Sequence, residues 1–309
     1  MGPTDRDDVV SGARGALGPV GVLLPVSFTG TPSVGLQREA VGRLERAGYR
    51  AAWTNEVVGG KDALVQVALL LAATRRMVFG TGIANIWARQ PATMHAAAAQ
   101  LAEAYPHRFV LGLGVGHPQQ AAATGQVYGS PLATMRDYRA RMDDPTQPPA
   151  PDVRYPRILG ANGPNMLALA GRITDGALPA GLPPEFTAQA RQVLGPDKLL
   201  VAGVSVVVDP DHDRARALAR ERVSASFGMP SYAAAIAGLG YEDDGTAEPS
   251  DRLVDAVVGH GSAEAIAATV RRHLAAGADH VLLMLPPGGE FTAGVDQLVR
   301  IAGPLVTLG

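Results

Sequence analysis

Several residue types are absent or scarce in this sequence, and each absence removes a class of function. There is no cysteine among the 309 residues, which excludes disulfides, thiol catalysis and cysteine-based metal sites. No run of about 18 consecutive apolar residues occurs, so no membrane-spanning helix is predicted. The first residues, MGPTDRDDVVSG, are acidic and lack an apolar run, so we expect no signal peptide and a cytoplasmic protein.

Lysine is also scarce, although the 27 Lys and Arg residues together nearly balance the 29 Asp and Glu residues. Lys61 and Lys198 are the only lysines, and the formal net charge is −2 with no basic cluster. This pattern argues against nucleic acid as a partner. The six histidines other than His117 show no HxH or HExxH spacing, so no metal site is predicted. A small molecule is the expected partner.

What the sequence does contain is an alternation of buried strands and amphipathic helices. Hydrophobic residues make up 47% of the chain, enough to bury a large core. The predicted strands are residues 19–24, 50–54, 77–82, 108–118, 157–160, 175–178, 199–208 and 278–285. Eight such units predict a closed (β/α)8 TIM barrel. An open doubly wound sheet would need a glycine fingerprint after its first strand, which ends here in Pro25.

The domain organisation follows from the same pattern. Residues 1–16 are polar and contain glycine, so we expect a flexible tail before a single barrel domain at 17–309. The proline-rich stretch 143–156 is a connection inside that domain, because the alternation resumes after it. Residues 210–258 are mostly helical by pattern and too long for one crossover, which predicts a helical insertion after strand seven.

One stretch, RFVLGLGVGHP at 108–118, has unusual glycine spacing. Gly112, Gly114 and Gly116 alternate with apolar residues, which is typical of a buried parallel strand whose end lacks side chains on one face. Its open N–H groups could receive an anion, and His117 follows at the mouth. Alternatively, the glycines only relieve crowding at a barrel corner.

Active sites of such barrels lie at the C-terminal ends of the strands. Glu56 directly follows a strand, where it could donate a proton, anchor a hydrogen bond, or be a surface carboxylate. Asn162–Asn165 begins a helix with Gly-Pro, which suits either an anion or an ordinary cap. Together with Gly114–Gly116 it suits one phosphorylated cofactor. Other candidates at strand ends are residues 82–85, Asp175 and residues 286–290.

Four stretches, taken in order, carry a resemblance to a known family. AGYRAAWTNE, ATRRMVFGTGIANIWARQPATM, HRFVLGLGVGHP and LGANGPNMLALAGRITDGALP resemble the luciferase-like monooxygenase superfamily, in its branch that uses the deazaflavin coenzyme F420. The resemblance covers Val20 to Pro287. It implies a TIM barrel with a helical insertion after strand seven and a deazaflavin or flavin across the barrel mouth.

The resemblance also implies a set of site residues. Gly82–Ile83 would form a non-proline cis peptide that supports the cofactor ring. Residues implied to contact the cofactor are Glu56, Gly82, Ile83, Asn85, Gly114, Val115, Gly116, His117, Asn162, Gly163, Pro164 and Asn165. Two positions depart from many relatives: an Asp-His pair is here Glu56-Val57, and a carboxylate after the glycine run is here His117.

We therefore predict an F420-dependent oxidoreductase that passes a hydride between C5 of the deazaflavin and a small organic substrate. His117 is the first candidate for the acid/base group, since histidine changes charge near neutral pH. Glu56 is the second candidate, or it orients the ring. The alternatives are an FMN-dependent monooxygenase and a non-catalytic cofactor-binding protein. A homodimer is expected through helices such as 91–105, whose alanines permit close packing.

Overall fold

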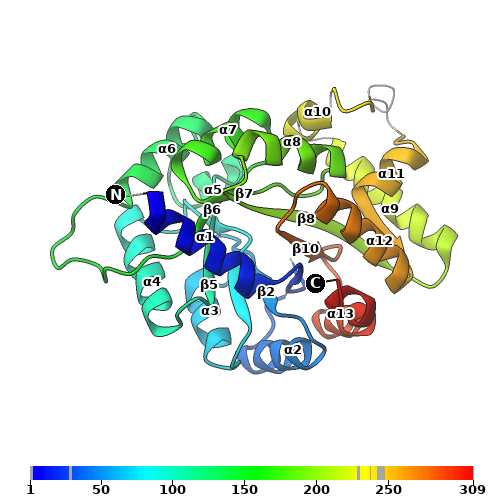
Figure 1. The fold of residues 1–309 in the computed structure, drawn as a ribbon, viewed down its shortest axis with the longest axis horizontal. Coiled ribbons are helices and arrows are strands. Elements are labelled where there is room, and N and C mark those ends of the chain that lie inside the picture. The colour runs from blue at the N-terminus through cyan, green and yellow to red at the C-terminus, as the bar shows by residue number, and fades with distance from the viewer. Residues whose placement is uncertain (1–2, 28–29, 228–229, 237, 242–247, 309) are drawn as a thin grey trace.

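The computed structural model describes residues 3–27, 30–227, 230–236, 238–241 and 248–308. Its centre is a closed parallel barrel, which confirms the predicted (β/α)8 fold (Figure 1). Register pairs Val20 with Val281 and Leu283 with Val204, so the last strand closes the ring between the first and the seventh. The barrel strands are β1 (Val20–Leu23), β2 (Ala51–Thr54), β3 (Val78–Thr81), β5 (Phe109–Gly114), β6 (Arg157–Gly160), β7 (Gly176–Leu178), β8 (Leu199–Val208) and β10 (His280–Met284).

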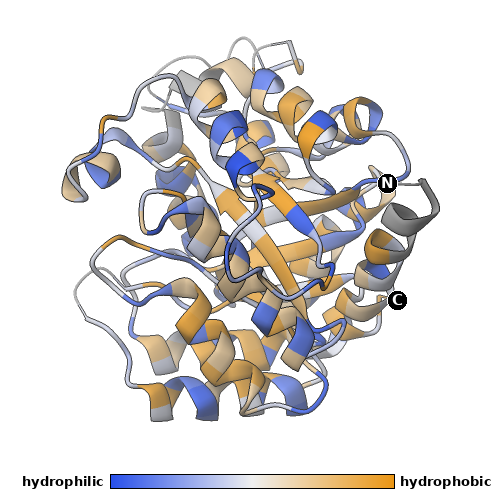
Figure 2. Cartoon of the chain, turned by 90° about the vertical axis from the view of Figure 1, so that its left-hand side faces the viewer, coloured by the Kyte–Doolittle hydropathy of each residue, from blue (hydrophilic) through white to orange (hydrophobic). Residues whose placement is uncertain are grey.

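Amphipathic helices surround the barrel. Many begin at a residue that the sequence marks as a helix start: Ser33 and Ser262 accept N–H hydrogen bonds as N-caps, and α4 begins with Pro91. Figure 2 shows strands mostly in orange and helices in alternating orange and blue. The helices of this layer are α2 (Val34–Arg46), α3 (Ala63–Leu71), α4 (Pro91–Ala104), α6 (Pro131–Arg141), α7 (Pro164–Ile173), α8 (Pro184–Leu194), α12 (Ala263–Ala275) and α13 (Phe291–Val306).

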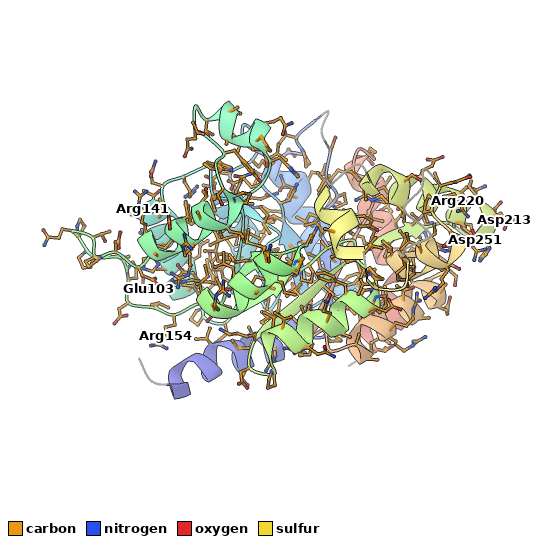
Figure 3. All side chains as sticks on the ribbon, turned by 90° about the horizontal axis from the view of Figure 1, so that it is seen from above. Glu103, Arg141, Arg154, Asp213, Arg220 and Asp251 are labelled. Atoms are coloured by element: carbon orange, nitrogen blue, oxygen red, sulfur yellow. The ribbon has the colours of Figure 1, made fainter. Side chains whose placement is uncertain are left out.

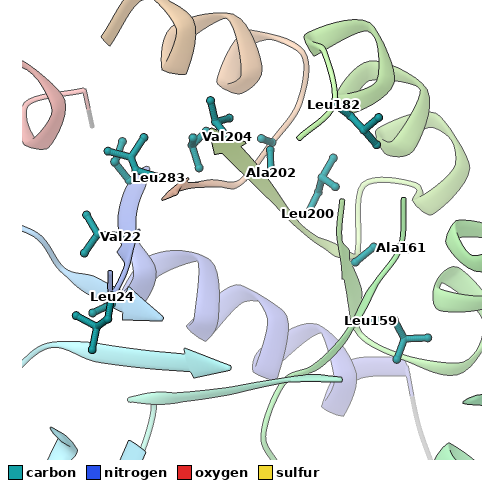
Figure 4. Close-up of a cluster of buried hydrophobic side chains, with 14 of the residues drawn as sticks. Val22, Leu24, Leu159, Ala161, Leu182, Leu200, Ala202, Val204 and Leu283 are labelled. Atoms are coloured by element: carbon teal, nitrogen blue, oxygen red, sulfur yellow. The ribbon is translucent and has the colours of Figure 1, made fainter. Parts of the chain in front are cut away.

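Side chains alternate between the two faces of each barrel strand, as strand geometry requires. Outward residues such as Val22, Leu200 and Leu283 pack against the helices (Figure 4). Inward residues such as Trp53 and Ile158 form a separate interior cluster.

A histidine lies at the base of this interior. His280 is fully buried, and its Nε2 accepts the indole N–H of Trp53 at 3.2 Å. Its Nδ1 lies 2.7 Å from the carbonyl oxygen of Gly18. Burial lowers the pKa of His280 to about 4, so the ring is neutral at neutral pH. This is a core histidine with satisfied partners and not a ligand for a metal.

The expected flexible tail at residues 1–16 is wrong for residues 3–16, because helix α1 (Pro3–Leu17) occupies them and lies across the barrel (Figure 1), while residues 1–2 lie outside the described residues. Val10, Ala13 and Leu17 are buried in the interior cluster. They recur at helical spacing, but the polar residues between them hide this pattern in the sequence. Arg14 fastens the helix by donating to the carbonyl of Lys198 at 2.8 Å and pairing with Asp279 at 3.0 Å. Helix α1 therefore closes the N-terminal end of the barrel.

The predicted insertion after the seventh barrel strand is present, but it is not entirely helical. It comprises α9 (His212–Phe227), α10 (Pro230–Ile236), α11 (Asp251–Val257) and a short strand, β9 (Val258–Gly261), that the sequence analysis missed. Strand β8 extends beyond the end of β10, with which it pairs as far as Ser205. Its last four residues, from Ser205 to Val208, pair with β9. Two glycines in VGHG hid this strand, because glycine weakens the strand signal.

Ion pairs join the helices of the insertion. Arg220 of α9 pairs with Asp251 of α11 at one end of the molecule (Figure 3), and Arg216 pairs with Asp255 at 2.9 Å. None of the described helices combines the length and apolar character needed to span a membrane.

Candidate functional site

A backbone bulge follows β3 at the C-terminal end of the barrel. The Gly82–Ile83 peptide bond is cis, as the family resemblance implied. The short strand β4 (Ala84–Asn85) then pairs with the end of β5 in the register Asn85↔Gly114. The bulge therefore lies directly beside the glycine run.

The side chain of Ile83 explains part of the glycine pattern. A Cβ atom built on Gly114 would overlap the Ile83 side chain, and one on Gly160 of β6 would lie 3.3 Å from Ile83 Cγ2. Both glycines make room for this side chain, which lies over the ends of two neighbouring strands. The crowding interpretation of Gly114 is therefore confirmed, and the group that crowds it is the Ile83 side chain of the bulge. That the neighbouring N–H groups receive an anion stays a prediction.

Glu56 is buried, with 6% of its surface exposed, and its carboxylate is fully engaged. Oε1 accepts the backbone N–H of Ala63 at 3.0 Å, and Oε2 accepts that of Asn85 at 2.8 Å. The backbone N–H of Glu56 donates to the carbonyl of Ile83 at 3.1 Å. Because charge-assisted hydrogen bonds are the stronger kind, Glu56 ties the bulge to the β2 loop. Its geometry is that of a hydrogen-bond anchor.

Asn85 presents an unused donor inside the mouth. Its Oδ1 accepts the N–H of Trp87 at 3.0 Å, while its buried Nδ2 has no hydrogen-bond partner among the described residues. A Cβ on Gly116 would lie 2.8 Å from that Nδ2, and Gly116 has a φ of +57°, which favours glycine. A buried unsatisfied donor costs about 1–3 kcal/mol, so this amide is suited to a ligand.

In the loop after β5, backbone carbonyls accept hydrogen bonds, whereas two backbone N–H groups donate none to the described residues. Trp87 Nε1 donates to the carbonyl of Val115 at 2.7 Å, and the Tyr128 hydroxyl donates to that of Gly116 at 2.8 Å. The N–H groups of Val115 and Gly116 have no acceptor within the described part of the chain. The sequence analysis did not identify Trp87 and Tyr128, because nothing in their local pattern indicates contact with these carbonyls.

His117 follows this loop and is exposed. It is the N-cap of a short helix, α5 (Pro118–Ala123), which was not predicted. Its backbone N–H donates to Gln120 Oε1 at 2.8 Å. Its side chain accepts the backbone N–H of Gln120, so that the two residues form a capping box. The exposed part of the ring can still meet a ligand at the rim.

Asn162–Asn165 begins α7 beside the β5 loop, since Leu113 of β5 pairs with Leu159 of β6. Asn162 Oδ1 accepts the N–H of Ala180 at 2.9 Å, which joins this loop to the one after β7. Gly163 is the N-cap and Pro164 the first helical residue. Among the described residues no acceptor meets the N–H of Asn165, so this helix start is both a cap and a potential anion site.

Two other predicted positions do not join this group. Asp175 precedes β7, so it lies at the N-terminal end of the barrel, where its Oδ2 accepts the N–H of Arg157 at 3.0 Å. Glu290 caps α13 by accepting the N–H groups of Thr292 and Ala293 at 2.9 and 2.6 Å. Both carboxylates therefore have structural partners. Asp175 was misplaced because it starts a strand and does not follow one.

The barrel mouth thus combines a cis bulge with two neighbouring sets of N–H groups that have no acceptor among the described residues. Residues 19–280 match the family model of the luciferase-like monooxygenases, and the chain belongs to that family.

Relatives named for F420 chemistry match parts of the chain. A candidate coenzyme F420-dependent oxidoreductase of Mycobacterium tuberculosis is 32% identical over 46% of this chain and 50% of its own length. A 5,10-methylenetetrahydromethanopterin reductase of Archaeoglobus fulgidus is 27% identical over 57% of this chain and 61% of its own. The chain thus spans half to three fifths of the length of these relatives.

Solved structures match over nearly their whole length. An F420-dependent secondary alcohol dehydrogenase, in complex with an F420-acetone adduct, aligns with a TM-score of 0.71 and 16% identity, covering 93% of this chain and 98% of that one. A Type II Baeyer-Villiger monooxygenase component from Pseudomonas putida in complex with FMN aligns with a TM-score of 0.69 and 13% identity, over 94% and 98%. At these identities the likeness shows a common fold.

Proposed function

We propose that this protein is an oxidoreductase that uses coenzyme F420 to transfer a hydride to or from a small organic substrate. The observation that carries the proposal is the unused Asn85 amide beside the cis bulge, next to the open N–H groups of Val115 and Gly116. Family membership and the F420-linked names of relatives support the choice of cofactor. The cytoplasm remains the expected compartment.

The residues at the mouth fit such a cofactor. Ile83 would form the floor beneath the ring, with Glu56 holding the bulge in place. The open N–H groups after β5 and at the start of α7 would hold the phosphorylated tail, since oriented N–H groups and a helix N-terminus favour an anion. When bound, the deazaflavin supplies the hydride chemistry, and the protein supplies orientation and proton transfer.

His117 is the residue we assign to proton transfer. Its ring is exposed at the rim, beside the Gln120 N–H that it caps. The imidazole would accept the hydroxyl proton of an alcohol that is being oxidised, or return it to a carbonyl that is being reduced. Glu56 is less suited to this step, because both carboxylate oxygens already accept backbone N–H groups.

A pair of titrations tests the proposal. Purified protein is titrated separately with oxidised F420 and with FMN, and the fluorescence of Trp87 beside the Val115 carbonyl serves as the signal. We expect F420 to quench this signal, and the Trp87→Phe variant identifies which tryptophan responds. Binding of FMN alone would favour the monooxygenase alternative. F420 binding without turnover across a broad panel of alcohols and ketones would favour a non-catalytic binding protein.

The homodimer is part of the same proposal. In α4 the buried residues include Met94, Ala98 and Ala99, so these alanines pack within the subunit. Any dimer contact would therefore use other faces of the helices that follow the early strands. Sedimentation at micromolar concentration tests this, and a monomer there would contradict it.

A further inference from the structure

A cavity lies at the rim of the barrel, formed by the loops after β1, β8 and β10. Its volume is about 290 Å³. These strands are neighbours in the ring and lie on the other side of it from β5 and β6. The β1 and β10 loops are joined where Gly288 donates its N–H to the carbonyl of Val26 at 2.8 Å. The cavity thus lies among loops at the C-terminal end of the barrel, the end that also carries the open N–H groups, and the helices α9 and α13 complete its wall.

The walls of this cavity are largely apolar. Contributing side chains come from the three loops and from the helices α9 and α13: Val26, Val207, Leu218, Leu285, Pro286 and Ala293. Within the described residues, no lysine, arginine or histidine lines it. A ligand that carried a phosphate or carboxylate into this space would lose hydration without a cationic partner, which is costly.

Two carboxylates, those of Asp209 and Glu290, lie at the edge of the cavity, and both already accept hydrogen bonds from the protein. Asp209 accepts two hydrogen bonds from Arg214, each 2.6 Å long, and one from the N–H of Asp211. Glu290 accepts two N–H groups at the start of α13, where the helix dipole also offsets its charge. These carboxylates repel an anion, and their hydrogen bonds leave little to attract a cation.

Gln297 is the one neutral polar side chain in the lining. It is half-buried on α13, and the described residues provide no partner for its amide. An amide can donate to a carbonyl and accept from a hydroxyl. This group therefore matches an alcohol or a ketone and offers no counter-charge to an ionised group.

We infer that this cavity is the substrate pocket and that it selects a neutral, mostly apolar alcohol or carbonyl compound. The inference rests on the proposed function. Since a 150 Å³ cavity holds benzene, a cavity of this volume suits a body of about a dozen non-hydrogen atoms. Phosphorylated sugars and carboxylates of similar size fall outside the class.

Probes that differ in charge test the preference of the cavity for a neutral ligand. We compare 2-octanone with 7-oxooctanoate, which carries a carboxylate at the far end of a similar chain, and with glucose 6-phosphate. Each is titrated by calorimetry into protein with and without F420, and turnover is followed from the absorbance of F420. We expect 2-octanone to bind at least about tenfold more tightly than 7-oxooctanoate, a difference of about 1.4 kcal/mol.

A cation introduced into the wall should reverse this preference. Leu218→Lys places an ammonium group at the cavity, and we expect it to improve 7-oxooctanoate binding about tenfold relative to 2-octanone. Val193→Lys on α8 is the matched control, since the two residues are similarly exposed, at 43% and 47%. Gln297→Leu should weaken 2-octanone binding several-fold while leaving F420 affinity unchanged.

The outcomes separate the two proposals. Failure of F420 to bind would remove the proposed function, while 2-octanone binding to the cofactor-free protein would still support the pocket. Tight F420 binding with turnover of glucose 6-phosphate or 7-oxooctanoate, and none of 2-octanone, would overturn the substrate class alone. An equal effect of Leu218→Lys and Val193→Lys would show that the substrate binds elsewhere.

Discussion

The two ends of this barrel differ in which of their hydrogen-bonding groups have partners. At the N-terminal end, Arg14 pairs with Asp279 and caps a backbone carbonyl, while His280 is buried between two partners. At the C-terminal end, the Asn85 amide and the N–H groups of Val115 and Gly116 lack acceptors among the described residues. Satisfied groups stabilise a fold, and unsatisfied ones are available to a ligand. The comparison predicts that stability and ligand binding depend on separate ends of the molecule.

The largest effect should come from filling the mouth. Gly114→Val places a side chain where Ile83 already lies, so the bulge must move and cofactor binding should fall beyond detection. Overpacking typically costs about 1–3 kcal/mol, which a barrel of this size should survive. Circular dichroism and an F420 titration measure the two effects. Gly303→Val, which meets no atom within 4 Å, is the control, and undiminished F420 affinity in folded Gly114→Val would contradict the expectation.

Removal of the rim imidazole should affect chemistry and spare binding. His117→Ala should slow turnover by about 10²–10⁴-fold, the usual contribution of a positioned acid/base group. Cofactor affinity should change little, because the neighbouring N–H groups belong to the backbone. His117→Gln should also be slow, since an amide keeps a hydrogen bond and carries no proton. Near-normal turnover of His117→Gln would show that the ring only contacts the ligand.

A substitution at the N-terminal end of the barrel should change the stability of the fold and leave F420 affinity unchanged. Leu17 is fully buried beneath the barrel, so Leu17→Ala should lower the free energy of unfolding by about 2–5 kcal/mol. Denaturant unfolding measures this cost, and an F420 titration below the transition should give the parent affinity. A loss of affinity in the folded variant would mean that the two ends are coupled.

The smallest effect should come from weakening the anchor of the bulge. In Glu56→Gln one carboxylate oxygen becomes an NH2 group that faces a backbone N–H, at a cost of about 1–3 kcal/mol. We expect F420 affinity to fall roughly tenfold, which corresponds to 1.4 kcal/mol. The pH profile of turnover should keep its shape, because the carboxylate holds the bulge and moves no proton. The exposed Glu39→Gln is the matched control, and a changed pH profile in Glu56→Gln alone would assign Glu56 to catalysis.

Much of this molecule was predictable from local pattern. Alternating strands and helices predicted the barrel, and the glycine run and Asn162–Asn165 were correctly expected at the ends of neighbouring strands. The cis peptide at Gly82–Ile83 was implied by resemblance to relatives. These features depend on residues close together in the chain, or on a motif that relatives share.

Other features depended on contacts that only closure of the barrel creates. Glu56 is an anchor because Asn85, 29 residues later, lies where the next strand ends. Likewise, α1 is buried because its apolar residues meet side chains from strands throughout the chain. Periodicity shows which face of an element is apolar, but not which distant element covers it. Sequence determined the architecture and the positions of the candidate residues, and tertiary structure decided which of their polar groups were already occupied.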